Sequence, residues 1–100
     1  VLEPNYRGSI GYGDEFVDEL RLSSLTRPGI DILSGVKQLI DECIVDADRT
    51  AIAGYSYGGY LTNWLITQTN QFNAACSGAG ATEHVSSWGT FDIPTYIQYL

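Results

Sequence analysis

The sequence predicts an α/β fold in which a parallel sheet is covered by helices. Strand-like and helix-like segments alternate along the 100 residues, and this order produces parallel sheets wrapped by helices. In the middle of the series, the short apolar run 50–53 passes through a glycine-rich stretch, 54–59, into an apolar helix-like segment. A short run that ends at a glycine in this way is typical of a buried parallel strand.

The first part of the chain predicts a strand end, a loop and a helix. Residues 1–5 are interpreted as the end of a strand, because Pro4 is tolerated at a strand terminus but not in its middle. The glycines of 6–13 have neither the dinucleotide-binding nor the P-loop spacing, and they predict a connecting loop with positive φ angles. An acidic helix is expected over 14–22, with one apolar side formed by Phe16, Val17 and Leu20.

The middle of the chain predicts an amphipathic helix that covers one face of the sheet. We expect it to begin near Ile30 or Asp31, after the break Arg27-Pro28-Gly29, with Asp31 favourably placed for the helix dipole. Apolar residues then recur at steps of three and four, as helix periodicity requires: Ile32, Leu33, Val36, Leu39, Ile40 and Cys43.

The rest of the chain continues the alternation of strands and helices. A polar turn over 46–49 leads into a strand over 49–53, a helix is expected over 60–67, and 72–77 is interpreted as another buried strand. Ligands of such sheets bind beyond the carboxyl ends of the strands. Ser56 and the segment from Gly78 onward both fall there.

Residues 54–58 have the G-x-S-x-G pattern of a nucleophile elbow. In this turn a strained backbone exposes the central Ser, and the flanking positions favour Gly because a Cβ would collide where strand and helix cross. Gly54 and Gly58 fill those positions, and Gly59 would let the helix start close to the sheet. Such strain costs about 1–3 kcal/mol, which favours a use for it. Ser56 is therefore a candidate nucleophile, and a glycine-rich turn without chemistry is the alternative.

Composition excludes several classes of function. A net charge of −7, with no Lys or Arg after Arg49, argues against binding to nucleic acid. No run is long enough to cross a membrane, and no signal peptide is visible. Cys43 and Cys76 lack metal-site spacing, so no metal, cofactor or disulfide framework is predicted, and each is expected to be a small buried hydrophobe. The compartment stays open.

The ends of the chain indicate a piece of a longer protein. The sequence begins at Val1 inside a strand-like run and stops at Leu100 without a terminating signal. We therefore expect residues 1–100 to be the central part of a domain that is incomplete at both ends.

Three segments resemble the α/β-hydrolase domain of the prolyl oligopeptidase family. They are 5–13 (Asn-Tyr-Arg-Gly-Ser-Ile-Gly-Tyr-Gly), 46–49 (Asp-Ala-Asp-Arg) and 54–64, which contains Gly-Tyr-Ser-Tyr-Gly-Gly-Tyr and Thr-Asn-Trp. The likeness runs from about Asn5 to Ile93 and is closest to the acylaminoacyl-peptidase and dipeptidyl-peptidase branches. It implies a partial α/β-hydrolase fold and a serine peptidase acting on short peptides. It also implies an N-terminal β-propeller domain that is not part of these residues.

The resemblance carries over to particular positions. Ser56 matches the nucleophile, and the backbone N–H of Tyr57 matches one oxyanion-hole donor. The family's Asp and His follow beyond the last residue of this sequence, so the isolated chain is expected to be inactive. The family lines the pocket for the residue before the scissile bond at Ala81, His84 and Trp88. An aromatic is common at the position of His84, which is therefore a departure.

Several alternatives remain open at this point. The same elbow serves an esterase, and the fold also occurs in non-catalytic interaction modules. Glu83, His84 and Asp92 could complete a triad with Ser56, although in α/β-hydrolases the acid precedes the base. On a helix, the steps from Ala81 to His84 and from His84 to Trp88 would place all three on one face. The alternative is that Trp88 covers the core.

Overall fold

A computed structural model describes residues 1–21 and 23–95, so Leu22, the end of one predicted helix, lies outside the described residues. Its elements in chain order are α1 (Asp14–Asp18), α2 (Thr26–Asp41), β1 (Ala51–Tyr55), α3 (Tyr57–Gln68), β2 (Ala74–Gly78) and α4 (His84–Thr90). The predicted parallel sheet is confirmed, because β1 and β2 pair in parallel from Ala51 opposite Ala74 to Tyr55 opposite Gly78.

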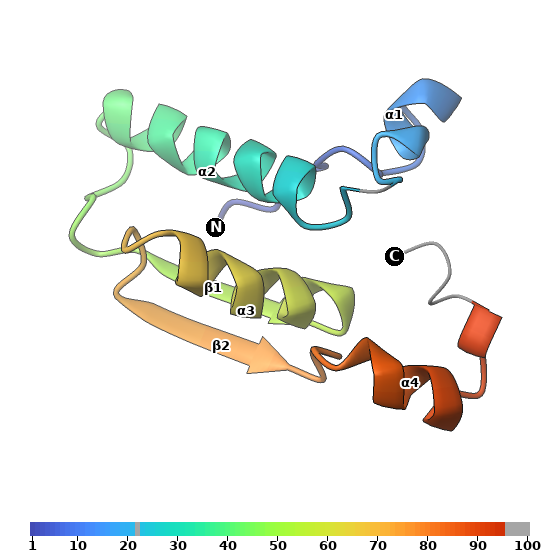
Figure 1. The fold of residues 1–100 in the computed structure, drawn as a ribbon. Coiled ribbons are helices and arrows are strands. Elements are labelled where there is room, and N and C mark those ends of the chain that lie inside the picture. The colour runs from blue at the N-terminus through green and yellow to red at the C-terminus, as the bar shows by residue number, and fades with distance from the viewer. Residues whose placement is uncertain (22, 96–100) are drawn as a thin grey trace.

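Helix α3 packs on one face of this sheet and carries the core (Figure 1). Leu61 and Leu65 are buried in it, with exposed fractions of 2% and 0%. The Ser77 hydroxyl of β2 donates a hydrogen bond of 3.0 Å to the carbonyl of Gly59, which ties the sheet to the first turn of α3. On the strands themselves, Ala53 and Tyr55 are exposed.

Helix α2 begins earlier than the sequence predicts, at Thr26 instead of near Ile30. The break expected at Arg27-Pro28-Gly29 is wrong, because Pro28 lies in the first turn, where a backbone N–H has no intrahelical acceptor and its loss costs nothing. The Gly29 N–H already donates to the carbonyl of Leu25 at 2.9 Å, so the helix is closed at this point.

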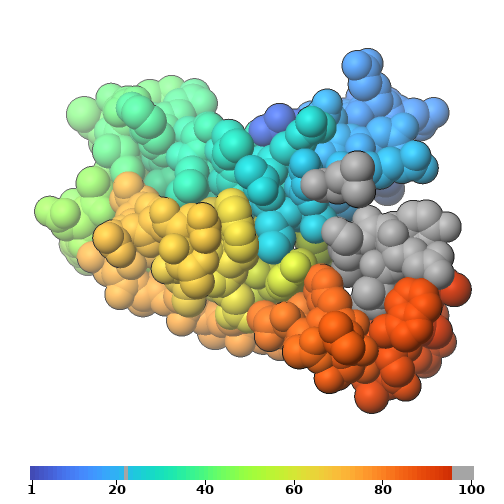
Figure 2. Space-filling view, in the orientation of Figure 1, coloured from blue at the N-terminus to red at the C-terminus, as the bar shows by residue number. Residues whose placement is uncertain are grey.

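Helix α2 packs against α3 and not directly against the strands. A Cβ on Gly29 would lie 2.4 Å from Cζ3 of Trp64, so the missing side chain allows the two helices to approach. Ile32 and Val36 instead line a cavity of about 800 Å³, together with β1 residues such as Ile52. The expectation that this helix covers a sheet face is therefore wrong for the described residues. Figure 2 shows α3 between α2 and β2.

The N-terminal segment differs from the sequence prediction in two respects. Residues 1–5 pair with no strand among the described residues, so the predicted strand end is wrong. Helix α1 ends at Asp18, short of the predicted bound, and its carboxyl end runs into turns. The loop itself is confirmed, because Gly8, Gly11 and Gly13 have φ angles of 101°, 94° and 94°.

The strands and the cysteines differ from the sequence prediction in smaller ways. Strand β1 extends to Tyr55 because Gly54 and Tyr55 still pair with β2, and β2 begins only at Ala74. The turn over 46–49 is confirmed by the Arg49 N–H, which donates to the Asp46 carbonyl at 3.0 Å. Cys43 and Cys76 are both exposed, so the prediction of buried thiols is wrong.

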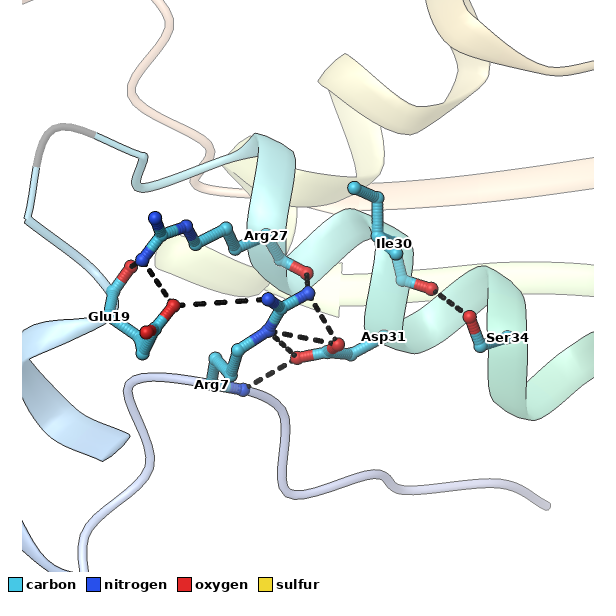
Figure 3. Close-up of polar contacts among 6 residues, drawn as sticks. All are labelled: Arg7, Glu19, Arg27, Ile30, Asp31 and Ser34. Carbon is cyan, nitrogen blue, oxygen red and sulfur yellow. Dashed lines mark hydrogen bonds and ion pairs between the residues drawn. The ribbon is translucent and has the colours of Figure 1, made fainter. Parts of the chain in front are cut away.

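A charged cluster ties the N-terminal loop to α2 (Figure 3). Both the Arg7 backbone N–H and its Nη2 bind the Asp31 carboxylate, at 2.9 and 2.8 Å. Arg27, one helical turn before Asp31, binds the Glu19 carboxylate. Partial burial alone would raise the pKa of Asp31, but the hydrogen bonds and charge of Arg7 outweigh it and leave that pKa lowered.

None of the described helices has the length and apolar character that crossing a membrane requires. Among the described residues, no group of three or more His, Cys, Asp or Glu side chains could hold a metal ion.

Candidate active site

Ser56 is the single residue between the end of β1 at Tyr55 and the start of α3 at Tyr57, and it has φ 57° and ψ −119°. A non-glycine residue in this region carries strain of about 1–3 kcal/mol, which its surroundings must hold. The Ser56 N–H donates to the Gly78 carbonyl at 2.8 Å, and its carbonyl accepts from the Tyr60 N–H at 3.0 Å. Ser56 is exposed, and its hydroxyl neither caps α3 nor bonds to any described residue. The turn therefore presents a hydroxyl at the carboxyl end of a parallel strand.

Glycines make this turn sterically possible. A Cβ on Gly54 would lie 2.1 Å from the carbonyl oxygen of Gly58, and one on Gly59 would lie 2.4 Å from that of Gly78. The expected roles of Gly54 and Gly59 are thus confirmed. The expected collision at Gly58 is wrong, because a Cβ there would meet nothing within 4 Å. The backbone of Gly58 lies at the crossing of β1 and α3, but the space where its own Cβ would lie is open, and Gly58 also lines the large cavity.

Tyr57 is the first residue of α3, so its backbone N–H lies at the positive end of the helix dipole. Its phenol hydroxyl donates a hydrogen bond to the carbonyl of Ser24. Its ring lies 6.3 Å from that of Tyr6 and 6.5 Å from that of Tyr60, measured between centroids. The residue after Ser56 is therefore held by its side chain as well as by the helix.

The three residues expected to line a pocket fall in and before α4. Ala81 lies in the loop that precedes α4, so the expectation of one shared helical face is wrong for Ala81. The ring of His84 lies 4.9 Å from that of Tyr60, which brings the start of α4 to the first turn of α3. Trp88 follows one turn later and is 49% exposed, so it is not part of the core of the described residues.

Glu83 acts as the N-cap of α4 and not as a partner of a catalytic base. Its carboxylate accepts from the N–H groups of Val85 at 3.1 Å and Ser86 at 2.6 Å. These bonds, that of Ser86 first, lower the pKa of Glu83 because they favour its charged form. The His84 Nε2 is buried and has no hydrogen-bond partner among the described residues. Within those residues, no triad of Ser56, His84 and a carboxylate is assembled.

The contacts that surround the elbow are not predicted from the sequence. Gly80 packs so closely on α3 that a Cβ there would lie 2.8 Å from the carbonyl carbon of Gly59. The paired glycines at 78 and 80 were a readable signal of this approach, since Gly in or after a strand often marks close backbone contact. Ser24, which binds the Tyr57 hydroxyl, and His84, which contacts the Tyr60 ring, lie 33 and 24 residues away in sequence and leave no local signal.

Comparison with known proteins identifies the family. Residues 1–100 match the family Peptidase_S9, the prolyl oligopeptidase family. The chain belongs to the prolyl oligopeptidase family. Among curated relatives, the uncharacterized peptidase YuxL of Bacillus subtilis is 38% identical over 98 residues, which cover 93% of this chain and 14% of YuxL.

Two solved acylaminoacyl peptidase structures share the fold. The enzyme from Pyrococcus horikoshii superimposes with a TM-score of 0.86 and 35% identity, covering 94% of this chain and 16% of that one. An acylaminoacyl peptidase in complex with Z-Gly-Gly-Phe-chloromethyl ketone gives a TM-score of 0.86 and 36% identity with the same coverage. The predicted partial α/β-hydrolase fold is confirmed. This prolyl oligopeptidase family chain spans 12% to 14% of the length of the first three curated relatives.

Proposed function

We propose that this chain is the nucleophile-bearing, central part of a serine peptidase domain that hydrolyses short peptides through an acyl-enzyme on Ser56. The strained, exposed position of Ser56 at the strand-to-helix turn, with φ 57° and ψ −119°, carries the proposal. Membership of the prolyl oligopeptidase family supports it. The likeness to two acylaminoacyl peptidases, of which the chain covers 16%, supports the view that the intact domain is much larger.

In the intact enzyme, a His from outside these residues accepts the proton of the Ser56 hydroxyl as Oγ bonds to the peptide carbonyl carbon. The carbonyl oxygen becomes an oxyanion and accepts a hydrogen bond from the Tyr57 backbone N–H. Collapse of this intermediate breaks the C–N bond, and the leaving amine takes the proton from the His. Water then attacks the Ser56 ester by the same steps and releases the acid.

The pocket for the residue before the scissile bond is proposed to include Ala81, His84 and Trp88. The contact between His84 and Tyr60 supports this, because it brings the first residue of α4 against the first turn of α3, the helix that begins directly after Ser56. The half-exposed Trp88 offers an apolar surface one helical turn further on. Substrates with an apolar or proline residue at this position fit such a surface. The N-terminal β-propeller of the intact protein stays a prediction.

The test compares Ser56→Ala with Ser34→Ala in the intact protein. Ser34 is a matched control, because it is exposed and its hydroxyl donates, among the described residues, only to the Ile30 carbonyl on α2. With a chromogenic N-acylated peptide, kcat should fall by at least about four orders of magnitude in Ser56→Ala and stay unchanged in Ser34→Ala. Turnover of p-nitrophenyl acetate without peptide hydrolysis would instead make the protein an esterase. A folded protein that turns over neither compound would be an interaction module.

A further inference from the structure

The side chain of Tyr57 is held from two directions by segments far away in the sequence. Its hydroxyl donates to the carbonyl of Ser24, directly before the Leu25 N-cap of α2. On its other side is the ring of Tyr6, at 6.3 Å and tilted by 50°. A small cavity of about 250 Å³ lies beside the two rings and is lined by Tyr6, Gly8, Ser9, Leu20 and Tyr57.

Both supports of the Tyr57 ring are themselves fixed to the N-terminal end of α2. Arg7 follows Tyr6, and its guanidinium forms a paired hydrogen bond with Asp31 through Nε at 2.9 Å and Nη2 at 2.8 Å. Such paired contacts fix orientation as well as distance. The Arg7 Nη2 also donates to the Arg27 carbonyl at 3.2 Å in the first turn of α2. Tyr6 and Ser24, which both contact the Tyr57 side chain, are therefore both held at the N-terminal end of α2.

The contacts that hold the Tyr57 side chain also restrict the backbone that carries the chemistry. Ser56 holds a strained conformation, and Tyr57 is the next residue, so a fixed Tyr57 side chain limits rotation of the peptide unit between them. Donors aimed at an oxyanion work only when they are placed in advance, and a misplacement of about 1 Å can cost about a hundredfold in rate. We propose that the side chain of Tyr57 is a positioning residue, which, given the proposed function, sets the backbone N–H toward the oxyanion.

The test is Tyr57→Phe in the intact enzyme, which removes the hydroxyl and keeps the ring. We expect kcat per active site to fall about tenfold with KM unchanged within about twofold, because the lost restraint acts in the transition state. Active sites are counted by titration with a fluorophosphonate, so a variant that merely folds less well loses sites and not kcat per site. Tyr12→Phe is the matched control, because the wild-type Tyr12 hydroxyl also forms a hydrogen bond within the N-terminal loop, where it accepts from Asn5 Nδ2 at 3.0 Å.

A second variant covers the case in which Tyr57→Phe does not fold. Tyr6→Leu removes the flanking ring and leaves Tyr57 intact, and it should lower kcat per site in the same direction. Wild-type kcat per site in every variant that folds would overturn the inference. This failure differs from failure of the proposed function, in which Ser56→Ala itself would keep the activity.

Discussion

At the scale of single residues, the turn at Ser56 depends on a missing side chain at Gly54. The Gly54 Cα faces the carbonyl of Gly58, so strand and helix cross with no room for a methyl group. Gly58, directly before Gly59, has open space where its own Cβ would lie. Within this motif, the available space therefore requires glycine at 54 and not at 58.

This difference gives a matched pair of variants. In the intact enzyme Gly54→Ala should lower the free energy of unfolding by about 1–3 kcal/mol or more and abolish activity, because backbone must move to admit the Cβ. Gly58→Ala should be neutral or stabilise α3 by up to about 1 kcal/mol, since Ala is the better helix former. Denaturant melts and peptide turnover measure both. Equal losses in the two variants would contradict the geometry at the elbow.

A substitution at His84 tests the proposed pocket while keeping the existing contact between this side chain and Tyr60. Its Nε2 is buried without a partner among the described residues, while its ring lies against Tyr60. His84→Phe should keep the ring contact, raise stability by up to about 1 kcal/mol through loss of an unsatisfied polar atom, and raise kcat/KM for apolar substrates. Thermal melts and steady-state kinetics measure the two effects. Complete loss of turnover in a folded variant would instead identify His84 as the catalytic base.

At the scale of elements, the loop of Arg7 and helix α2 are joined by an ion pair that depends on pH. The pKa of Asp31 is lowered below its usual value of 3.8. A lowered carboxyl pKa adds stability above the unfolded pKa, and this stability is lost as the pH falls through the folded value. The joint between loop and helix should therefore weaken only in acid, below about pH 4.

The prediction is that Asp31→Asn lowers the Tm of the intact enzyme by a few degrees at pH 7. The gap to wild type should narrow as the pH falls below about 4 and close once the pH lies below the folded pKa of Asp31, where the carboxyl of the wild type is protonated as well. Arg7→Met should show a gap of at least the same size, because the Arg7 Nη2 also donates to the Arg27 carbonyl. In the double variant the two losses should be less than additive, because both variants remove the side-chain contact between Arg7 and Asp31. A gap that persists unchanged at pH 3 would show that the pair is not its cause.

The elements also show what sequence could and could not predict. Strand, turn and helix around Ser56 were predictable because the motif, the apolar run and the glycines are local. The start of α2 was missed because Pro28 marks a break in most contexts but is harmless in a first helical turn. Contacts such as Arg7 with Asp31, or Tyr57 with Ser24, join residues 24 and 33 apart in sequence. No periodicity encodes such pairs, so the candidate nucleophile was predicted and its supports were not.

At the scale of the whole molecule, the 100 residues bury little apolar surface. Leu61 and Leu65 form the buried hydrophobic core of the described residues, while Tyr55 on the sheet is 77% exposed. Within the described residues, strand β1 is paired on one edge only, with β2. Exposed strand edges and apolar faces favour association between chains.

The isolated 100 residues should consequently be inactive and only marginally stable. We expect a broad, non-cooperative thermal transition with concentration-dependent aggregation, because the core is too small to offset the conformational entropy of ordering the chain. Circular dichroism and light scattering measure both properties. A sharp melt of monomers together with ester turnover would contradict this expectation and would revive a triad that contains His84.

The most direct test of the account is to map where a fluorophosphonate probe binds to the intact protein. Digestion and mass spectrometry should place a single stoichiometric adduct on the hydroxyl of Ser56, the exposed residue that the strained turn presents. Prior incubation with a peptide substrate should slow the labelling, and Ser56→Ala should remain unlabelled. An adduct on another residue, or equal labelling of Ser56→Ala, would contradict the central claim that Ser56 is the nucleophile.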